Sequence, residues 1–369
     1  MKILIVDDSV VFRSQIKAVV EGISQITEIS LASNGKLALQ RLETGHFDIM
    51  TLDMEMPEMN GIETLKALKS LPNCPAVIVF SAVTSRGAEA TIQAMELGAI
   101  DFSPKPAQAM NLEEAQKLIR QDLAPKIIQL CQKLQRLKAG PMTSERAALN
   151  PILHMPEHIN LQFEMSKQWS KVNLDFFRPA AIVIGSSTGG PAALKSVLRG
   201  VRKPLQAPIF ITQHMPPIFT KSLADNLSSQ LGIAVEEGRN LEVVQANKIY
   251  IAPGDYHMSL KNRGDQVTIV LDQREKRCSV RPAVDYLFES AAEIYGSKLL
   301  GIVLTGMGQD GLLGCKAIKD RKGAVIIQDE ASSTVWGMPG AVFKHGAFDK
   351  MCSLVELEVV LGNQLGRVA

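Results

Sequence analysis

Short apolar runs alternate with amphipathic segments in two parts of the chain, and a stretch without this alternation separates them. In the first part, helical patterns are expected at 10–21, 35–44, 61–70, 85–97 and from near Leu112. The apolar runs between them are KILIV, ITEISLA, FDIMTLD, PAVIVFSA and residues 99–103. Five strands alternating with helices predict an α/β domain with a doubly wound, five-stranded parallel sheet of the flavodoxin type.

The alternation resumes with AAIVIG at residues 180–185. The later apolar runs are APIFITQ, KIYIAPG, QVTIVL, LLGIVLTG and GAVIIQ. Helical patterns are expected between them at 191–199, 218–230, 283–295 and 312–321. This second part therefore predicts another doubly wound α/β domain, with a mostly parallel sheet.

A length of 369 residues also favours two domains over one core. We expect domains at 1–121 and 179–369, joined by a linker at 122–178. The linker is punctuated by Pro125, Gly140, Pro141, Pro151 and Pro156. Residues 126–138 still have a helical pattern with a basic face. We favour a solvated extension of the preceding helix over a partner-binding helix.

The sequence around two histidines and the spacing of the cysteines argue against a zinc site and against disulfides. His154 and His158 have the spacing of a helical metal pair, but Pro156 lies between them and makes such a site improbable. The five cysteines are an odd number without a C-x-x-C pair, which favours reduced, buried thiols in a cytoplasmic protein.

The composition fits globular domains, with 46% hydrophobic and 21% charged residues. A net charge of +2 gives no reason to expect a nucleic-acid partner or an anionic membrane. No apolar run is long enough to span a bilayer, so we expect no membrane insertion. The start MKILIVDDS has two aspartates by residue 8, which argues against a secretory signal peptide.

Three carboxylates follow apolar runs of the first part, namely Asp7, Asp8 and Asp53. The carboxyl ends of parallel strands share one crevice, so these side chains should meet there. They repel one another unless a hard cation such as Mg²⁺ lies among them, and a carboxylate can itself accept a phosphoryl group. Ser81 and Lys105, after the fourth and fifth runs, offer a hydroxyl and a cation to phosphoryl oxygens.

With this full set in order, residues 1–121 resemble a response-regulator receiver domain. The resemblance implies that Asp53 is the phospho-acceptor and that Asp7 and Asp8 hold Mg²⁺ with it. It further implies that Ser81 is the switch hydroxyl and that Lys105 is the invariant lysine, followed by a cis proline. Phe102 takes the position of the rotating aromatic residue.

A possible nucleophile lies in the second part, where residues 185–189 fit the pattern G-x-S-x-G with Ser187 at its centre. The pattern stands between an expected strand and helix, as a nucleophile elbow requires. The helix N-terminus offers amide donors for an oxyanion. Ser186 is a rival nucleophile, but no alignment of the G-x-S-x-G pattern places Ser186 at its centre. Taken alone the motif is weak, because such turns also bind phosphate.

A serine nucleophile needs a base and an acid that orients the base. His214 directly follows an expected strand and projects at the same sheet edge as Ser187, whereas His257 follows a strand after a short loop. Asp310 stands in a glycine-rich loop at a strand end, and Asp255 is its rival. Position alone favours His214 only slightly and leaves these alternatives open.

Several motifs in order make residues 180–360 similar to the chemotaxis protein-glutamate methylesterase catalytic domain. They are IGSSTGG, TQHMPP, YIAPGDYHM, RPAVD, LTGMGQDG and WGMPG. The resemblance implies the triad Ser187, His214 and Asp310, without a cofactor for the esterase reaction. It makes Thr188 and Met307 active-site neighbours, and Ser186 stands where the family commonly has alanine.

Other residues of these motifs have weaker implications. His257 is equally a packing or turn residue and a substrate contact. Arg281 and Asp285 are structural or interdomain residues rather than catalytic ones, and core packing is expected for Trp336 and Met338.

Together the two resemblances imply a phosphorylation-activated enzyme of chemotaxis adaptation that demethylates glutamates and deamidates glutamines of chemoreceptors. A histidine kinase would donate the phosphoryl group, and the unphosphorylated receiver is expected to inhibit the esterase. One alternative is a two-component serine hydrolase of the same fold acting on another protein. A catalytically inactive binding module is a second. A DNA-binding regulator is disfavoured, because its effector half should be a basic helix-turn-helix rather than strand-rich.

Overall fold

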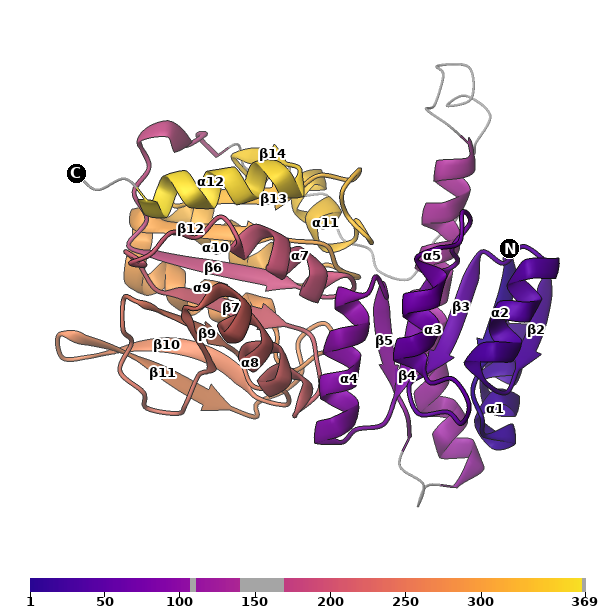
Figure 1. Ribbon diagram of the computed structural model, residues 1–369. Helices are drawn as coiled ribbons and strands as arrows, with labels where there is room; N and C mark the ends of the chain where they lie inside the picture. Colours follow the sequence, from indigo (N-terminus) through magenta and orange to yellow (C-terminus); the bar gives the residue numbers. More distant parts are fainter. Residues whose placement is uncertain (107–110, 140–168, 367–369) are drawn as a thin grey trace.

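The computed structural model describes residues 1–106, 111–139 and 169–366. The first domain is built on a five-stranded parallel sheet in the order β2-β1-β3-β4-β5. Its strands are β1 (Lys2–Val6), β2 (Glu28–Ala32), β3 (Ile49–Asp53), β4 (Ala76–Ser81) and β5 (Asp101–Pro104). Its helices are α1 (Val10–Glu21), α2 (Gly35–Thr44), α3 (Gly61–Leu68), α4 (Ser85–Glu96) and α5 (Leu112–Ala139). The predicted doubly wound fold is confirmed (Figure 1).

Each strand of this sheet sends alternate apolar side chains to opposite faces. Ile3 and Ile5 lie in the core under α1 and α5, whereas Leu4 and Val6 lie in the core under α2, α3 and α4. The first four helices begin at residues whose side chains accept a backbone N–H, which are Ser9, Asn34, Asn60 and Thr84. These caps fix where the chain leaves each strand end and turns into a helix.

Helix α5 differs from the sequence expectation, because it continues through Pro125 to Ala139. Proline removes one helical hydrogen bond. Burial of Ile127, Leu130 and Cys131 in the core shared with α1 compensates for this loss. The segment is therefore not a solvated extension. The expected histidine pair, His154 and His158, lies outside the described residues.

The second domain has a seven-stranded sheet in the order β14-β13-β12-β6-β7-β9-β8, with every neighbouring pair parallel. Its strands are β6 (Ala181–Ser186), β7 (Ile209–Gln213), β8 (Ala234–Glu237), β9 (Lys248–Ile251), β12 (Leu299–Val303), β13 (Ala324–Gln328) and β14 (Lys350–Cys352). On one face of the sheet pack α7 (Gly190–Leu198), α8 (Phe219–Leu231) and α12 (Leu354–Gly366). On the other pack α9 (Val284–Tyr295), α10 (Leu312–Asp320) and α11 (Met338–Lys344).

The expected strand QVTIVL does not belong to this sheet. It forms β11 (Gln266–Asp272), which pairs with β10 (His257–Arg263) in a separate antiparallel hairpin. The hairpin packs on α9 through Met258, Leu260 and Ile269. Periodicity identified an extended segment but carried no information about its pairing partner.

Two of the five cysteines are not buried as expected. Cys74 and Cys278 are exposed, whereas Cys131, Cys315 and Cys352 are buried, and all five are free thiols. Among the described ranges, no helix combines the length and the apolar character needed to cross a membrane.

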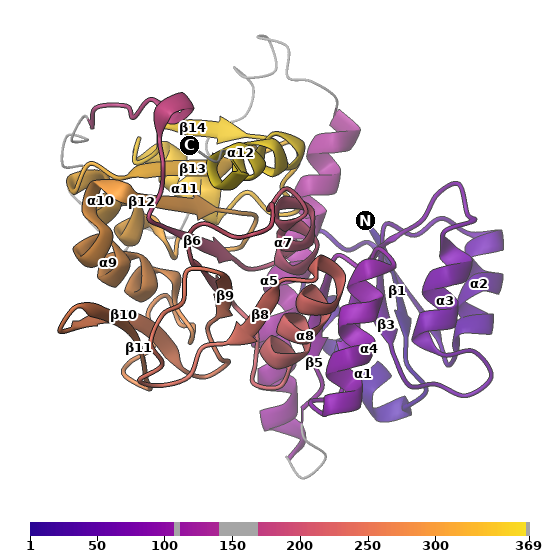
Figure 2. The ribbon, with the colours of Figure 1, turned by 60° about the vertical axis from the view of Figure 1, so that its left-hand side comes forward.

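The β5 edge of the first domain lies against the end of the second sheet where α7 and α8 begin (Figures 1 and 2). Phe102 of β5 stacks on Phe219 of α8 with ring centroids 4.6 Å apart. Glu96 at the end of α4 pairs with Lys195 of α7 at 3.0 Å. Farther along α5, Lys133 Nζ donates to the carbonyl of Ser333 at 2.6 Å. The first domain thus contacts the second through α4, β5 and α5.

Candidate active site

The strand ends of the first domain bring Asp7, Asp8 and Asp53 together. Their carboxylates offer oxygens within 4.8 Å of one another. Lys105 Nζ lies 2.7 Å from Asp53 Oδ2 and 3.1 Å from Asp7 Oδ2, so among the described residues one cation is shared by these two buried carboxylates. Burial and the neighbouring Asp7 raise the pKa of Asp53 to about 6, against the opposing effect of Lys105. Three carboxylates with one lysine leave an excess of negative charge, which fits a divalent cation such as Mg²⁺.

The remaining receiver residues predicted from the sequence surround this cluster or face the second domain. Ser81 is buried, and its hydroxyl donates to the carbonyl of Gly87 at 3.1 Å. Phe102 is turned toward Phe219, as described above. The expected cis bond before Pro106 was wrong, because the cis bonds of the described chain precede Pro204 and Pro282.

Ser187 stands on the turn between β6 and α7. Its N–H donates to the carbonyl of Thr305 at 3.0 Å, and its own carbonyl accepts from Gly190 at 2.7 Å. Gly189 has a φ of 76°, and a side chain there would meet Thr334. The tight turn therefore requires glycine at this position and leaves Ser187 half-buried at the sheet edge.

Ser186, the rival nucleophile, points into the protein. It is fully buried, and its hydroxyl donates to Gln213 Oε1 at 2.7 Å. Gln213 Nε2 in turn donates to the carbonyl of Ser187 at 2.9 Å. Gln213 therefore ties the serine turn to the end of β7, a role that its place directly before His214 could have suggested.

His214 and Asp310 are brought together across the sheet edge. His214 follows β7, and its Nε2 lies 2.8 Å from Asp310 Oδ2. No hydrogen bond joins Ser187 to His214 among the described residues. The two nevertheless line one cavity of about 60 Å³. The structure thus places the three residues predicted as a triad at one site.

Asp310 is held by backbone donors on both oxygens. Oδ2 accepts from Val284 N at 2.6 Å, and Oδ1 accepts from Asp285 N at 3.0 Å and Gly311 N at 2.9 Å. Burial alone raises the pKa of Asp310, but the hydrogen bond from His214 and these donors bring the pKa below its ordinary value. Asp310 is therefore ionised and oriented before any reaction.

Helices α9 and α10 cap each other across this site. Neither helix has a side-chain cap from its own N-cap residue. The first two N–H groups of α9 donate to Asp310, which precedes α10. The N–H of Gly314, in the first turn of α10, donates to Asp285 of α9 at 2.7 Å. Two positive helix ends thus converge on the two carboxylates.

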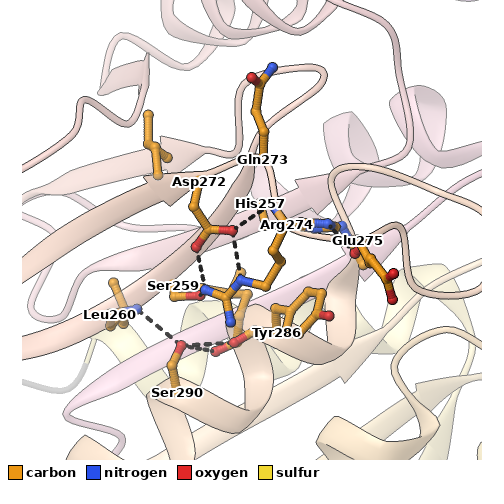
Figure 3. Close-up of polar contacts among 12 residues, drawn as sticks. His257, Ser259, Leu260, Asp272, Gln273, Arg274, Glu275, Tyr286 and Ser290 are labelled. Atoms are coloured by element: carbon orange, nitrogen blue, oxygen red, sulfur yellow. Dashed lines mark hydrogen bonds and ion pairs between the residues drawn. The ribbon is translucent and has the colours of Figure 1, made fainter.

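His257, the rival base, makes its hydrogen bonds away from Ser187. It is fully buried at the start of β10, and Figure 3 shows it in the polar network of the hairpin, near Asp272 and Arg274. Its Nδ1 accepts from Ala283 N at 3.1 Å, its Nε2 lies 3.1 Å from the carbonyl of Glu275, and burial lowers its pKa. These contacts fit the packing alternative for His257.

Other motif residues also have structural partners. The rival acid Asp255 pairs with Arg281 at 2.7 Å rather than with a histidine. Met338 is buried, which confirms core packing for that residue, whereas Trp336 is half-buried and its Nε1 donates to the carbonyl of Gln328 at 3.2 Å. Met307 lies on the loop after β12, and Thr188 lines the cavity beside Ser187.

The first domain closes the cavity at Ser187. Its own lining residues are Asp101, Phe102, Pro104, Asp122 and Lys126. Burial raises the pKa of Asp101, against the opposing effects of Lys126 and of a hydrogen bond from Thr188. Sequence reasoning missed Asp101 because its position next to Ser187 depends on how two domains pack.

Comparisons with known proteins cover the whole chain. The family model described as CheB methylesterase matches residues 182–361, and the one described as response regulator receiver domain matches residues 3–117. Proteins called protein-glutamate methylesterase/protein-glutamine glutaminase are similar over nearly their full length. The one from Trichodesmium erythraeum is 40% identical, covering 99% of each chain. The one from a Nocardioides species is 37% identical, covering 100% of this chain and 96% of the relative.

A solved structure is also similar. The crystal structure of the Thermotoga maritima CheB methylesterase catalytic domain shares 43% sequence identity, with a TM-score of 0.48. It covers 49% of this chain and 95% of that chain. With a receiver at its N-terminus and an esterase domain at its C-terminus, the chain belongs to the CheB family of protein-glutamate methylesterases/protein-glutamine glutaminases.

Proposed function

We propose that Ser187, His214 and Asp310 form the catalytic triad of this methylesterase and glutaminase. The observation that carries the proposal is the 2.8 Å contact between His214 Nε2 and Asp310 Oδ2 in the cavity that also exposes Ser187. Asp310 holds the imidazole in one orientation and stabilises its protonated form. The expected boundary at residue 121 falls inside α5, whose later residues Ile127 and Leu130 pack in the receiver core, so we further propose a receiver domain at 1–139 and an esterase domain at 179–369.

The reaction follows from this geometry. Asp310 occupies Nε2 of His214, so Nδ1 is the nitrogen that accepts the proton of Ser187. The Ser187 oxygen attacks the γ-carbonyl of a glutamyl methyl ester or a glutamine. The proton then passes from His214 to the departing methoxy oxygen or amide nitrogen, which leaves as methanol or ammonia. A water molecule then attacks the acyl-enzyme, gives its proton to His214 and releases the glutamate side chain with Ser187 restored.

The oxyanion requires donors that are not used elsewhere. The N–H of Ser187 is bonded to Thr305, which excludes it. The N–H groups of Thr188 and Met307 donate to no protein acceptor among the described residues. Thr188 N lies next to the start of α7, where the helix end adds a positive potential. We assign these two N–H groups to the oxyanion.

The receiver would control access to this site. Asp53 is the proposed phosphoryl acceptor, Asp7 and Asp8 with Asp53 would hold Mg²⁺, and Lys105 would bind a phosphoryl oxygen. Bound Mg²⁺ would offset the charge of the phosphoryl group and the carboxylates. Ser81 and Phe102 are the proposed switch residues, and Phe102 is also part of the wall that closes the cavity at Ser187. Phosphorylation would shift the chain from this closed arrangement to an open one.

The partners follow from the two activities. A chemotaxis histidine kinase would donate the phosphoryl group, and the cytoplasmic domains of methyl-accepting receptors would be the substrates, which places the enzyme in the cytoplasm. The esterase reaction uses protein groups alone, and neither nucleic acid nor membrane insertion enters the proposal. A different methylated protein remains the alternative substrate.

Release of methanol from methylated receptors tests the assignment. Ser187→Ala should abolish release while phosphorylation of Asp53 persists. Ser186→Ala is the matched control, because that hydroxyl is buried against Gln213, and it should retain most activity. The opposite pattern would place the nucleophile at Ser186. If His257→Ala loses activity and His214→Ala retains it, the general base is His257 and not His214.

A further inference from the structure

Asp285 is a second buried carboxylate beside the proposed triad. It is 1% exposed, and its carboxylate, that of Asp310 and the sulfur of Cys278 offer atoms within 4.8 Å of one another. It is the second residue of α9, and its own N–H donates to Asp310. A change of charge on Asp285 therefore acts at short range on the carboxylate that orients His214.

The capping role of Asp285 uses only part of its carboxylate. Oδ1 accepts from Gly314 N at 2.7 Å, and that is the only hydrogen bond of this carboxylate in the described part of the chain. A cap of this kind needs one acceptor oxygen, which an asparagine would also supply. The ionisable character of Asp285 is therefore not explained by the contact with α10.

The surroundings of Asp285 make its charge costly near neutral pH. The ionisable groups around it are Asp310, His214, Arg277, Glu289, Cys278 and Cys315. Both thiols have raised pKa values and stay neutral, and Arg277 is already paired with Glu289 at 2.7 Å. Burial and the negative Asp310 raise the pKa of Asp285 to about 7. Asp285 thus changes charge in the range where the histidine also works.

We propose that Asp285 is a positioning residue that acts on His214 through Asp310, so that the buried carboxylate pair carries one negative charge at low pH and two at high pH. This inference rests on the proposed triad. Formation of the imidazolium during attack by Ser187 is favoured by each negative charge nearby. Ionisation of Asp285, which releases its proton to solvent, should therefore accelerate the reaction.

The test compares the full chain with Asp285→Asn, which keeps the acceptor for Gly314 and removes the titration. Methanol release from methylated receptors is measured from pH 5.5 to 9 with saturating phosphodonor, and the phosphorylated fraction is determined at each pH. The kcat of the variant should be close to that of the wild type at the acid end. It should fall to roughly a tenth of the wild-type value at the alkaline end, which is the effect of about one pKa unit of coupling. KM should not change.

Asp349→Asn is the control. Asp349 is another buried carboxylate of the same domain that accepts backbone N–H groups, but it pairs with Lys319 away from the triad. The ratio of the kcat of Asp349→Asn to that of the wild type should be the same at every pH. A ratio for Asp285→Asn that is also independent of pH would show a purely structural role and overturn the inference.

Two further readouts keep the inference separate from the proposed function. If His214→Ala is inactive while the Asp285→Asn profile is parallel to wild type, the triad stands and the inference fails. If His214→Ala is active, the proposed function itself fails. Should Asp285→Asn not fold, the nuclear magnetic resonance titration of the His214 ring in the wild type decides. A two-step curve supports coupling to Asp285, and a single step contradicts it.

Discussion

Phe102 of the receiver lies stacked on Phe219 of the esterase domain, with ring centroids 4.6 Å apart and planes at 16°. Phe102 also lines the cavity at Ser187. Phe219 begins α8, five residues after His214. The receiver residue that should move with phosphorylation is therefore in direct contact with the helix that follows His214, the proposed general base. This stack links the phosphorylation site of the receiver to the cavity at Ser187.

Phe102→Ala should raise the activity of the unphosphorylated enzyme. A stacked aromatic pair contributes about 1 kcal/mol beyond its area, so its loss should open the closed arrangement about fivefold. Methanol release without phosphodonor is the measurement. Phe343→Ala, which removes an exposed ring packed on Trp336 and Phe348 within the esterase domain, is the control. Unchanged basal activity in Phe102→Ala would show that the stack does not hold the domains closed.

The contact of α5 with the esterase domain should have a smaller effect. Lys133→Met removes a part-buried hydrogen bond to Ser333 and should raise the unphosphorylated rate by about two- to fivefold. Arg136→Ala removes an exposed ion pair with Glu330 and should change the rate little, because such pairs contribute under about 1 kcal/mol. An effect of Arg136→Ala larger than that of Lys133→Met would reverse this ranking.

Phosphorylation of Asp53 should depend on pH and on Mg²⁺ together. Asp53 reacts as the carboxylate, and its pKa is raised to about 6, so the reactive fraction falls as pH drops through 6. Bound Mg²⁺ favours the ionised form and should move the midpoint to lower pH. Incorporation of labelled phosphate from a small phosphodonor, at low and saturating Mg²⁺, measures this. Labelling that survives EDTA, or that occurs in Asp53→Asn, would contradict the assignment.

Asp285 should make the esterase domain less stable as pH rises. Its folded pKa of about 7 lies above the ordinary value of 3.8. The stability that it contributes is therefore fully present below about pH 3.8 and is lost as pH rises through 7. At roughly 1.4 kcal/mol per pKa unit, the loss should amount to a few kcal/mol.

Denaturant unfolding of wild type and Asp285→Asn between pH 5 and 8.5 measures this loss. As pH rises across this range, the free energy of unfolding of the wild type should fall relative to that of the variant. A constant difference would mean that Asp285 is already ionised at low pH. A residue that lowers stability in this way is expected more often at a functional site than in a passive core.

The sequence predicted most strands and helices, because each strand of a parallel sheet is a continuous apolar run. The sequence-based prediction was wrong where strand pairing, rather than the local pattern, determines the structure. QVTIVL has the pattern of a sheet strand, yet it pairs with β10 and, through one bridge, with Val243, rather than with the seven-stranded sheet. The short edge strands Ala234–Glu237 and Lys350–Cys352 have too few residues for a periodic signal. Pro125 suggested a break, but tertiary burial of Ile127 and Leu130 overrides that local preference.

The residues of the proposed triad could be placed at one edge of the sheet from the sequence, because each follows an apolar run and parallel strands bring such positions together. The choice between His214 and His257 was not, since both follow strands and only the contacts to Asp310 and Ala283 separate them. The positions of Asp101 and Asp285 beside the proposed triad could not be predicted from the sequence. Their roles depend on the packing of two domains and on two helix ends that meet across the sheet.

Sulfonylation of Ser187 in the full chain by a serine-directed sulfonyl fluoride, with release of fluoride, is the most direct test of a phosphorylation-gated nucleophile. The labelled peptide is identified by mass spectrometry, and the labelling rate is measured with and without phosphodonor. Label is expected on Ser187, at a rate that rises several-fold on phosphorylation and is unresponsive to phosphodonor in Asp53→Asn. Label on Ser186, or an equal rate on Ser187 in both states, would contradict a phosphorylation-gated Ser187 site.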